Sequence, residues 1–241
     1  MQETGNNISH VKKILSIRLT SSGLSFYVST PGCPRSDGER RIPFARRDTG
    51  ITAAVRGIVE STPELSGYFS AVNIFIDTPD TVYAPAEVLR ADNVGAFLTA
   101  SGIYIPHGSG VAVSPVVADL RAAMRYDSGS LAFLRDYYGA RVSFYSPLQE
   151  NLELAAKKGF NYDGFIVNLT ERNMYITRFD GNGNLLLSEV YPHDTEADIV
   201  YYLYKLTEAT GTKNIRIRLF GPESEVACKV LGRYFKGVSC V

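Results

Sequence analysis

The sequence has no excess charge of either sign, because its 25 basic residues are balanced by 25 acidic ones. A chain without net charge has no general electrostatic attraction for nucleic acid or for an anionic membrane. Long apolar runs are missing too, since no stretch approaches the ~18 residues of a membrane-spanning helix. The polar start MQETGNNISH also differs from a secretory signal peptide. We therefore expect no nucleic-acid partner and no membrane span.

Cysteine is scarce, with only Cys33, Cys228 and Cys240 in 241 residues. An odd number of scattered cysteines argues against a disulfide framework and is typical of proteins in a reducing compartment. We therefore predict a cytoplasmic protein. Its apolar content of 45% is that of an ordinary folded chain with enough material for a core.

The short motifs of several enzyme classes are absent from the sequence. His10, His107 and His193 are far apart, and neither HExxH nor CxxC occurs, so a metal site built from histidine and cysteine is not expected. The stretch IPHGSGVAVS lacks the GxGxxG and GxxxxGK[ST] spacings, and we interpret it as a turn before a strand. No GxSxG elbow is present either. The function must therefore be argued from larger patterns.

One such pattern occurs twice. The segments LSIRLTSSGLSFYV, residues 15–28, and FIVNLTERNMYITR, residues 165–178, both carry alternating apolar residues on each side of a short turn. Such alternation predicts the two strands of a β-hairpin. Gly23 in TSSG and Asn173 in TERN hold the same place. Because these residue types best tolerate the positive φ of a short turn, we expect the turn chemistry to be repeated as well.

A third strand and a helix are predicted after the first hairpin. RRIPFAR resembles an exposed edge strand, because proline and arginines discourage stray pairing. The helix that follows is expected to begin at a cap formed by Asp48 or Thr49 and to end at Pro63. Its apolar face consists of Ile51, Val55, Ile58 and Val59.

The second hairpin has the same continuation. A turn in FDGNGN precedes a strand at 185–191, and Thr195 with Asp198 predicts a capping box for a helix that stops at Gly211. NIRIRLF is then expected to be a strand and GPESEVACKVLGRYF a helix with Pro222 in its first turn. GVSCV is predicted as a final strand.

Residues 71–159 have a less regular pattern. AVNIFIDTPDTVYAP predicts a hairpin around Thr78, Pro79 and Asp80, and PAEVLRADNVGAFLTASG predicts a helix. The pattern leaves open how the remaining elements are ordered in space. These are strands in VAVSPVVADL, LRAAMRYD and RVSFYSP, and helices in SGSLAFLRDYYG and QENLELAAKKG.

These elements predict an α/β fold of two tandem units. Each unit opens with a β-hairpin plus a third strand and continues as a mixed sheet flanked by helices. We place the first unit at residues 1–159, with extra hairpin and helix insertions, and the second at residues 160–241.

Two hairpin-led units of this kind resemble the actin-like ATPase superfold, a ribonuclease H-like architecture shared by actin, sugar kinases and chaperone ATPases. The chain also resembles an uncharacterised bacterial family with that fold, through LSIRLTSSGLSF, DTVYAPAEVL and the FIVNLTERNMYI–LLLSEVY block. The resemblance implies that a nucleotide would lie in a cleft between the units. Both hairpin turns and the start of the GPESEV helix would face it.

The first hairpin departs from the pattern of active members of that superfold. The resemblance implies an acidic residue late in the first strand, which holds magnesium through water, and then a glycine whose backbone admits phosphate. Arg18 stands at the acidic position and Thr20 at the glycine position. Ser21 and Ser22 fit the small hydroxyl residues that follow.

The other two motifs depart as well. Asn168 stands at the second acidic position, Thr170 at the glycine, and Glu171 brings negative charge where phosphate would lie. At the adenosine loop only Gly221 is retained, and Pro222 removes a backbone donor. The candidate cleft positions are Arg18, Thr20, Ser21, Ser22, Gly23, Asn168, Thr170, Glu171, Arg172, Gly221 and Pro222.

The sequence therefore favours a protein without catalytic residues, cofactor or metal, which acts as a binding or scaffolding module for a protein partner. The exposed edge strand and the tyrosines of YYLYK also allow a homodimer. The alternative is a divergent ATPase or phosphotransferase that binds ATP and magnesium in the cleft and takes its acidic residue from Asp77, Asp80 or Glu171. A cleft that binds a small molecule without turnover is a third hypothesis.

Overall fold

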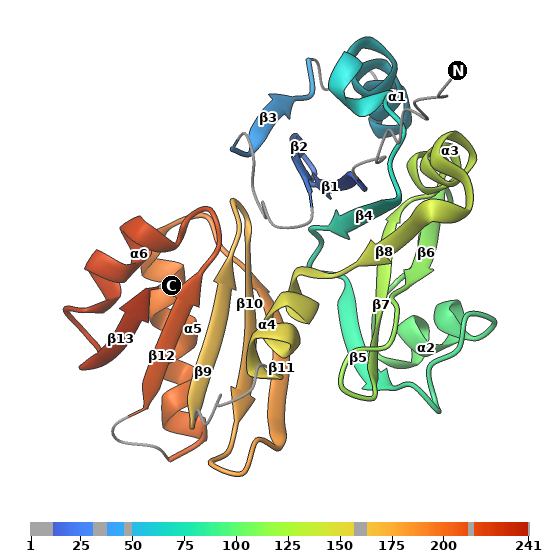
Figure 1. The fold of residues 1–241 in the computed structure, drawn as a ribbon. Coiled ribbons are helices and arrows are strands. Elements are labelled where there is room, and N and C mark those ends of the chain that lie inside the picture. Colours follow the sequence, from blue (N-terminus) through green and yellow to red (C-terminus); the bar gives the residue numbers. More distant parts are fainter. Residues whose placement is uncertain (1–11, 31–37, 46–49, 157–162, 212–214, 241) are drawn as a thin grey trace, which may run out of the picture.

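A computed structural model describes residues 12–30, 38–45, 50–156, 163–211 and 215–240. In this part of the chain, two five-stranded mixed sheets lie on either side of the molecule, and a three-stranded sheet adjoins the first (Figure 1). The α/β class and the hairpin at the start of each half are confirmed. The boundary between units at residue 160 stays a prediction.

The first sheet has the order β3-β2-β1-β4-β8. Strand β1 is antiparallel to β2 and parallel to β4, and helices α1 and α3 pack against each other beside it. A core of buried apolar side chains, including Leu15, Ile17 and Val55, lies between sheet and helices. The elements are β1 (Ile14–Leu19), β2 (Gly23–Ser29), β3 (Arg40–Pro43), α1 (Ile51–Ser61), the 3-10 turns Pro63–Leu65 and Gly139–Arg141, β4 (Ala71–Ile76), α3 (Ser128–Tyr138) and β8 (Val142–Tyr145).

The second sheet repeats this topology with the order β11-β10-β9-β12-β13. Strand β9 is antiparallel to β10 and parallel to β12, as β1 is to β2 and β4. Thr195 and Asp198 form the predicted capping box, and Gly211 follows the helix with a positive φ of 65°. The elements are β9 (Gly164–Leu169), β10 (Asn173–Phe179), β11 (Leu185–Pro192), α5 (Glu196–Ala209), β12 (Arg216–Phe220), α6 (Ser224–Leu231) and β13 (Gly237–Cys240).

The third sheet, β5-β7-β6, corrects the hairpin predicted around Pro79. Strands β4 and β5 do not pair: β4 lies between β1 and β8, whereas β5 pairs with β7. Strong strand patterns on both sides of a turn predicted direct pairing, but each strand buries its apolar residues in a different sheet. The elements are β5 (Thr81–Pro85), α2 (Val94–Ala100), β6 (Ser109–Val113) and β7 (Leu120–Asp127).

Three local predictions are also corrected. The helix predicted for residues 85–102 is confined to α2, since residues 86–93 form turns. Pro222 precedes α6 rather than lying in its first turn. Neither Gly23 nor Asn173 has a positive φ. Glycine is required at position 23 for another reason, because a Cβ there would lie 2.7 Å from the carbonyl oxygen of Ile42 on β3.

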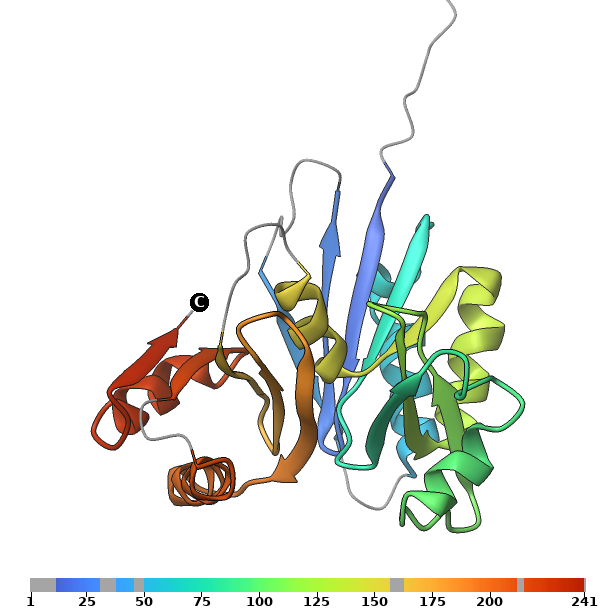
Figure 2. The same ribbon diagram turned by 90° about the horizontal axis from the view of Figure 1, so that it is seen from below.

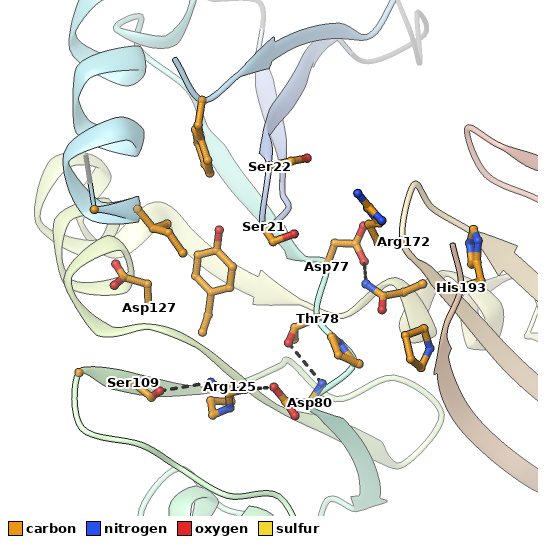
Figure 3. A pocket seen from close by; sticks show the side chains of 18 of the residues that line it. Ser21, Ser22, Asp77, Thr78, Asp80, Ser109, Arg125, Asp127, Arg172 and His193 are labelled. Carbon is orange, nitrogen blue, oxygen red and sulfur yellow. Dashed lines mark hydrogen bonds and ion pairs between the residues drawn. The ribbon is translucent and has the colours of Figure 1, made fainter. Parts of the chain in front are cut away.

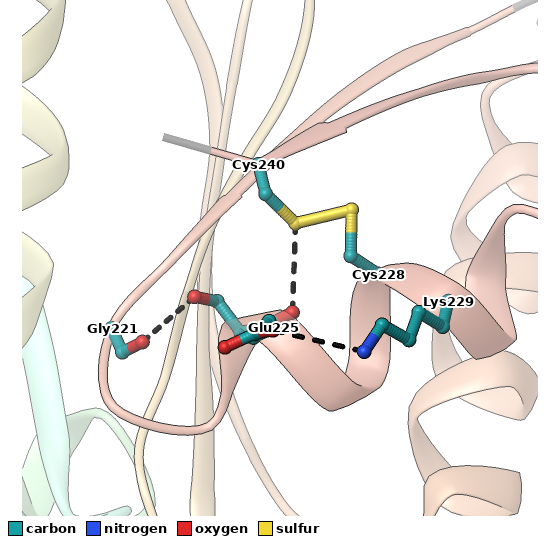
Figure 4. Close-up of a disulfide and its surroundings, with 6 residues drawn as sticks. Gly221, Glu225, Cys228, Lys229 and Cys240 are labelled. Atoms are coloured by element: carbon teal, nitrogen blue, oxygen red, sulfur yellow. Dashed lines mark hydrogen bonds and ion pairs between the residues drawn. A yellow bond between two sulfur atoms is a disulfide. The ribbon is translucent and has the colours of Figure 1, made fainter.

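A disulfide joins Cys228 of α6 to Cys240 of β13, which corrects the expectation from the cysteine count (Figure 4). The two residues are 12 apart in sequence, but packing of α6 on β13 brings their Cα atoms to 6.3 Å, within the range of a bridge. Cys33 and the predicted caps Asp48 and Thr49 lie outside the described residues, in which Gly50 precedes α1.

Helix α4 (Pro147–Ala155) lies between the two five-stranded sheets (Figure 2). It packs on β9 and β10, and Leu152 is a buried member of an apolar cluster that draws from both halves of the chain. Tyr83 and Leu120 enter this cluster from the three-stranded sheet, and Ile166 and Phe179 from the second five-stranded sheet. The halves are therefore joined by a small core of their own. None of the helices in the described ranges is long and apolar enough to cross a membrane.

Candidate functional site

The two hairpin turns, which are far apart in the sequence, touch each other in the structure. The hydroxyl of Ser22, between β1 and β2, donates a hydrogen bond of 3.0 Å to Oε2 of Glu171, between β9 and β10. The same carboxylate oxygen forms an ion pair with Arg41 of β3. Glu171 therefore faces the first unit, and its charge is balanced by an arginine of that unit rather than left free.

Threonine side chains accept hydrogen bonds from backbone N–H groups in both turns. In the first turn, Thr20 Oγ1 accepts hydrogen bonds from the backbone N–H groups of Ser22 and Gly23, at 3.2 and 3.0 Å. In the second turn, Thr170 Oγ1 accepts one from Asn173 N–H at 3.2 Å. These are the amides that an anion at a hairpin turn would need, because exposed backbone N–H groups bind phosphate oxygens. Their donor capacity is already used within each turn.

Both residues at the would-be acidic positions contact one carboxylate that sequence reasoning missed. Arg18 Nη2 donates to Glu150 Oε2 at 3.0 Å, and Asn168 Nδ2 donates to the same oxygen at 2.6 Å. Asn168 also donates to the carbonyl of Pro147 at 3.2 Å. Glu150 lies in the first turn of α4, so this helix connects β1 of the first sheet to β9 of the second.

The guanidinium of Arg18 remains positively charged in this position. Burial lowers the pKa of a guanidinium, but the neighbouring carboxylates of Glu150 and Asp77 outweigh it and raise the pKa of Arg18. Its side chain is 14% exposed. A fixed positive charge thus stands where the resemblance implied a ligand for a positive metal ion, and it would repel that ion.

Asp77, at the end of β4, forms a second connection between the halves. Its Oδ1 accepts hydrogen bonds from Asn173 Nδ2 and from the hydroxyl of Tyr175, both at 2.7 Å. The same hydroxyl oxygen lies 3.1 Å from the carbonyl oxygen of Thr78. Burial and the charge of Asp77 raise the pKa of Tyr175 well above its usual range, so the phenol stays a donor. Asp77 is 5% exposed, so these hydrogen bonds are shielded from solvent.

A cleft of about 1170 Å³ opens beside the touching turns (Figure 3). Its walls come from the hairpin turns, the start of α1, the β4–β5 connection, the three-stranded sheet and the end of β11. The candidate residues Ser21, Ser22 and Arg172 line it, together with Asp77 and Asp80. Asp80 is paired with Arg125, as Figure 3 shows, and Arg172 is paired with Asp194.

Most other candidate positions line a second cavity of about 220 Å³. These are Arg18, Thr20, Gly23, Thr170, Glu171 and Pro222. The structure thus places the predicted residues on both sides of the contact between the turns, in two cavities rather than one continuous nucleotide cleft.

Gly221 lies against the strand that carries Asn168. It has a φ of 102°, and a Cβ at this position would lie 2.3 Å from the carbonyl oxygen of Leu169 and 2.6 Å from Oδ1 of Asn168. This glycine allows the loop before α6 to pack on β9. The loop to which the resemblance assigned adenosine binding therefore packs against β9.

The residues present do not fit ATP and magnesium. An arginine and an asparagine stand in place of the carboxylates that would hold the metal, and Glu171 would repel phosphate. The alternative acids Asp77, Asp80 and Glu171 are each engaged with side chains of the protein. Among the residues described, no group of three or more histidine, cysteine, aspartate or glutamate side chains could hold a metal ion.

Glu150 and Tyr175 were the residues that sequence reasoning missed. Glu150 lies in a segment correctly predicted as a helix, but nothing in a helical pattern says that one carboxylate faces two distant strands. Tyr175 looks like an ordinary apolar strand residue in FIVNLTERNMYITR. Its hydroxyl partner is 98 residues away in the sequence.

The solved structures similar to this chain share its fold. A protein with actin-like ATPase fold and unknown function from Bacteroides thetaiotaomicron VPI-5482 is 20% identical, with a TM-score of 0.75 over 95% of this chain and 91% of that one. The PilM–PilN type IV pilus biogenesis complex is 12% identical, with a TM-score of 0.56 over 95% and 88%. The inorganic polyphosphate/ATP-glucomannokinase from Arthrobacter sp. strain KM is 12% identical, with 0.51 over 95% and 92%.

This likeness confirms the expected fold: the chain has the actin-like ATPase fold. At such low identity it shows the fold alone. No curated protein matches the sequence. One protein family matches, over residues 2–238, and its description is that of a protein of unknown function, DUF3822.

Proposed function

The chain belongs to this family of unknown function, DUF3822, and from its site we propose that it is a non-catalytic actin-like-fold protein that acts as a binding or scaffolding module. The observation that carries the proposal is the state of the two hairpin turns. The backbone N–H groups of Ser22, Gly23 and Asn173 donate to Thr20 and Thr170, and the tips of the turns are bonded to each other through Ser22 and Glu171. A phosphate would have to displace these contacts and approach a carboxylate.

Loss of the acidic positions supports the same proposal. Phosphoryl transfer relies on positioning and on metal ions that neutralise developing charge. Arg18 and Asn168 donate to Glu150 instead of binding such an ion. We propose accordingly that the protein uses neither ATP nor magnesium as a cofactor.

The partner is proposed to be another protein. The fold is compatible with this role, since one similar structure is a complex between two proteins, PilM and PilN. It is equally compatible with an enzyme, since another is a glucomannokinase. The side chains of the site, not the fold, therefore favour a binding module. We also propose that a second copy of this chain is a candidate for this protein partner.

Calorimetry of the full chain with ATP and magnesium tests the proposal. We expect no heat and no shift in melting temperature up to millimolar nucleotide. A control variant, Arg18→Asp with Asn168→Asp, restores both carboxylates and reports whether the turns alone prevent binding. Micromolar binding by the parent chain would overturn the proposal, and a turnover assay of Asp77→Asn and Asp80→Asn would then be required.

We also propose a cytoplasmic location, which the Cys228–Cys240 bridge puts to a direct test. Structural disulfides persist in oxidising compartments and are rare in the cytoplasm. Rapid alkylation of cells followed by mass spectrometry measures the oxidised fraction of the pair. The bridge in the structure counts against this location. A mostly reduced pair in cells would support the location, and a fully oxidised pair would contradict it.

A further inference from the structure

Among the residues that the structure describes, polar side chains cross between the two halves of the chain at several places. Asn151 of α4 donates to the backbone carbonyls of Ile166 and Tyr175, at 3.2 and 3.0 Å, and three further crossings lie at the hairpins and the strands beside them. Arg18 of β1 is bonded to Glu150, which also holds Asn168 of β9. The remaining two crossings are Asp77 to Asn173 and Tyr175, and Ser22 to Glu171. All three lie where the actin-like resemblance put nucleotide and metal.

We propose that these contacts form an internal lock, which holds the two hairpin turns against each other without any ligand. In this lock, the guanidinium of Arg18 supplies the positive charge between carboxylates that a bound metal ion could otherwise supply. The inference does not depend on whether nucleotide binds elsewhere, because it concerns only the contacts between the halves.

Burial makes the inner contacts of the lock strong. Asp77 is 5% exposed, and Tyr175 is fully buried. A hydrogen bond to a charged group in a low-dielectric setting is stronger than one at the surface, and leaving such a group without its partner is costly. Glu150 is 26% exposed, but its Oε2 accepts from two donors at once. The contact of Ser22 with Glu171 is exposed and adds less.

Two buried atoms suggest how the inner parts of the lock connect. Nη1 of Arg18 and Oδ2 of Asp77 find no hydrogen-bond partner among the residues that the structure describes. Both residues line the cavity of about 220 Å³. A cavity of this size has room for water, and a water held by Arg18 and Asp77 would bridge a donor and an acceptor that are too far apart to meet. Arg18, Glu150 and Asp77 then act as one network of charges.

The apolar cluster around Leu152 should keep the two halves together when the lock is removed. It joins the halves through Tyr83 and Phe179, independently of the polar contacts. Removing the lock should therefore move the hairpin turns apart without separating the halves or unfolding either core. Tyr175 should gain solvent exposure on opening. Tyr138, which is buried in the first core and bonded to the carbonyl of Leu65, should not.

Hydroxyl-radical footprinting of the full chain, in buffer with EDTA, tests this difference. The lock variant is Asp77→Ala with Glu150→Gln. A matched control, Asp92→Ala with Glu60→Gln, makes the same changes at exposed surface pairs with Arg90 and Arg56. We expect oxidation of Tyr175 to rise about tenfold or more in the lock variant, as for a local opening, with Tyr138 unchanged. The control should match the parent chain.

Unchanged oxidation of Tyr175 in a folded lock variant would overturn the proposal. If oxidation of Tyr138 rises equally, the variant has unfolded, and Arg18→Lys decides instead, because it keeps the charge but loses the planar guanidinium. Faster oxidation confined to Tyr175 in Arg18→Lys supports the lock, and parent-like oxidation refutes it. Small-angle scattering should show a larger radius of gyration for any variant that opens.

Discussion

Replacing Tyr175 by phenylalanine removes one hydroxyl from the centre of the molecule and leaves the ring in place. That hydroxyl donates to Asp77 Oδ1 at 2.7 Å and lies 3.1 Å from the carbonyl oxygen of Thr78. Asp77 keeps only Asn173 as a side-chain donor after the change. The variant therefore isolates one charged hydrogen bond between the halves of the chain.

The size of the effect follows from the charge of the acceptor. Hydrogen bonds to charged groups contribute about 1.5–3 kcal/mol, against about 1 kcal/mol between neutral partners. The Tyr175→Phe variant also leaves a buried carboxylate with fewer donors, which adds to the loss. We expect the free energy of unfolding to fall by about 2–3 kcal/mol.

Urea unfolding monitored by circular dichroism measures this change, with Tyr138→Phe as the matched control. Tyr138 is also buried, but its hydroxyl donates to a neutral carbonyl, that of Leu65, at 3.0 Å. The control should lose only about 1 kcal/mol. Equal losses in the two variants, or a loss below about 0.5 kcal/mol for Tyr175→Phe, would refute the reasoning that Asp77 is charged and anchored by this phenol.

Further predictions concern the backbone, a helix cap and pH. Gly221→Ala should destabilise by about 3 kcal/mol or more, since its Cβ would meet the carbonyl of Leu169, whereas Gly211→Ala, also at positive φ but in open space, should lose about 1 kcal/mol. Asp127→Ala removes the carboxylate that caps α3 and should lower the unfolding free energy by about 1 kcal/mol. The free energy of unfolding should fall as the pH rises above about 10, because the raised pKa of Tyr175 makes the folded state keep a proton that the unfolded state releases. Tyr175→Phe should lessen this fall when unfolding is measured over a series of alkaline pH values. A flat profile above that pH would contradict it.

The repeated hairpins, the helices that follow them and the capping box at Thr195 and Asp198 were predictable because they depend on local sequence. Alternating apolar residues define a strand wherever it lies, and a side chain three residues into a helix caps its own start. The confirmed strands β1, β2, β9 and β10 and the confirmed helix α5 are of this kind. Likewise, Arg18 and Asn168 could be recognised as foreign to a metal site from their side chains alone.

Pairing at long range was not predictable. Whether β4 pairs with β5 depends on which core buries each strand, and two such strong strands look the same in sequence. The Cys228–Cys240 bridge is similar, because only the packing of α6 on β13 brings the two sulfurs together. Counting cysteines does not measure that distance.

The sequence by itself determined the α/β class, the duplicated hairpin and the presence of Arg18 and Asn168 where the resemblance implies carboxylates, because each of these is a property of residue type and spacing. Only the tertiary structure decided what replaced them. Glu150 joins Arg18 to Asn168, and Asp77 meets Asn173 and Tyr175, across 96 or more residues of chain in the latter case. Which residues meet depends on how the two sheets and α4 are positioned relative to one another. A local sequence pattern does not contain that information.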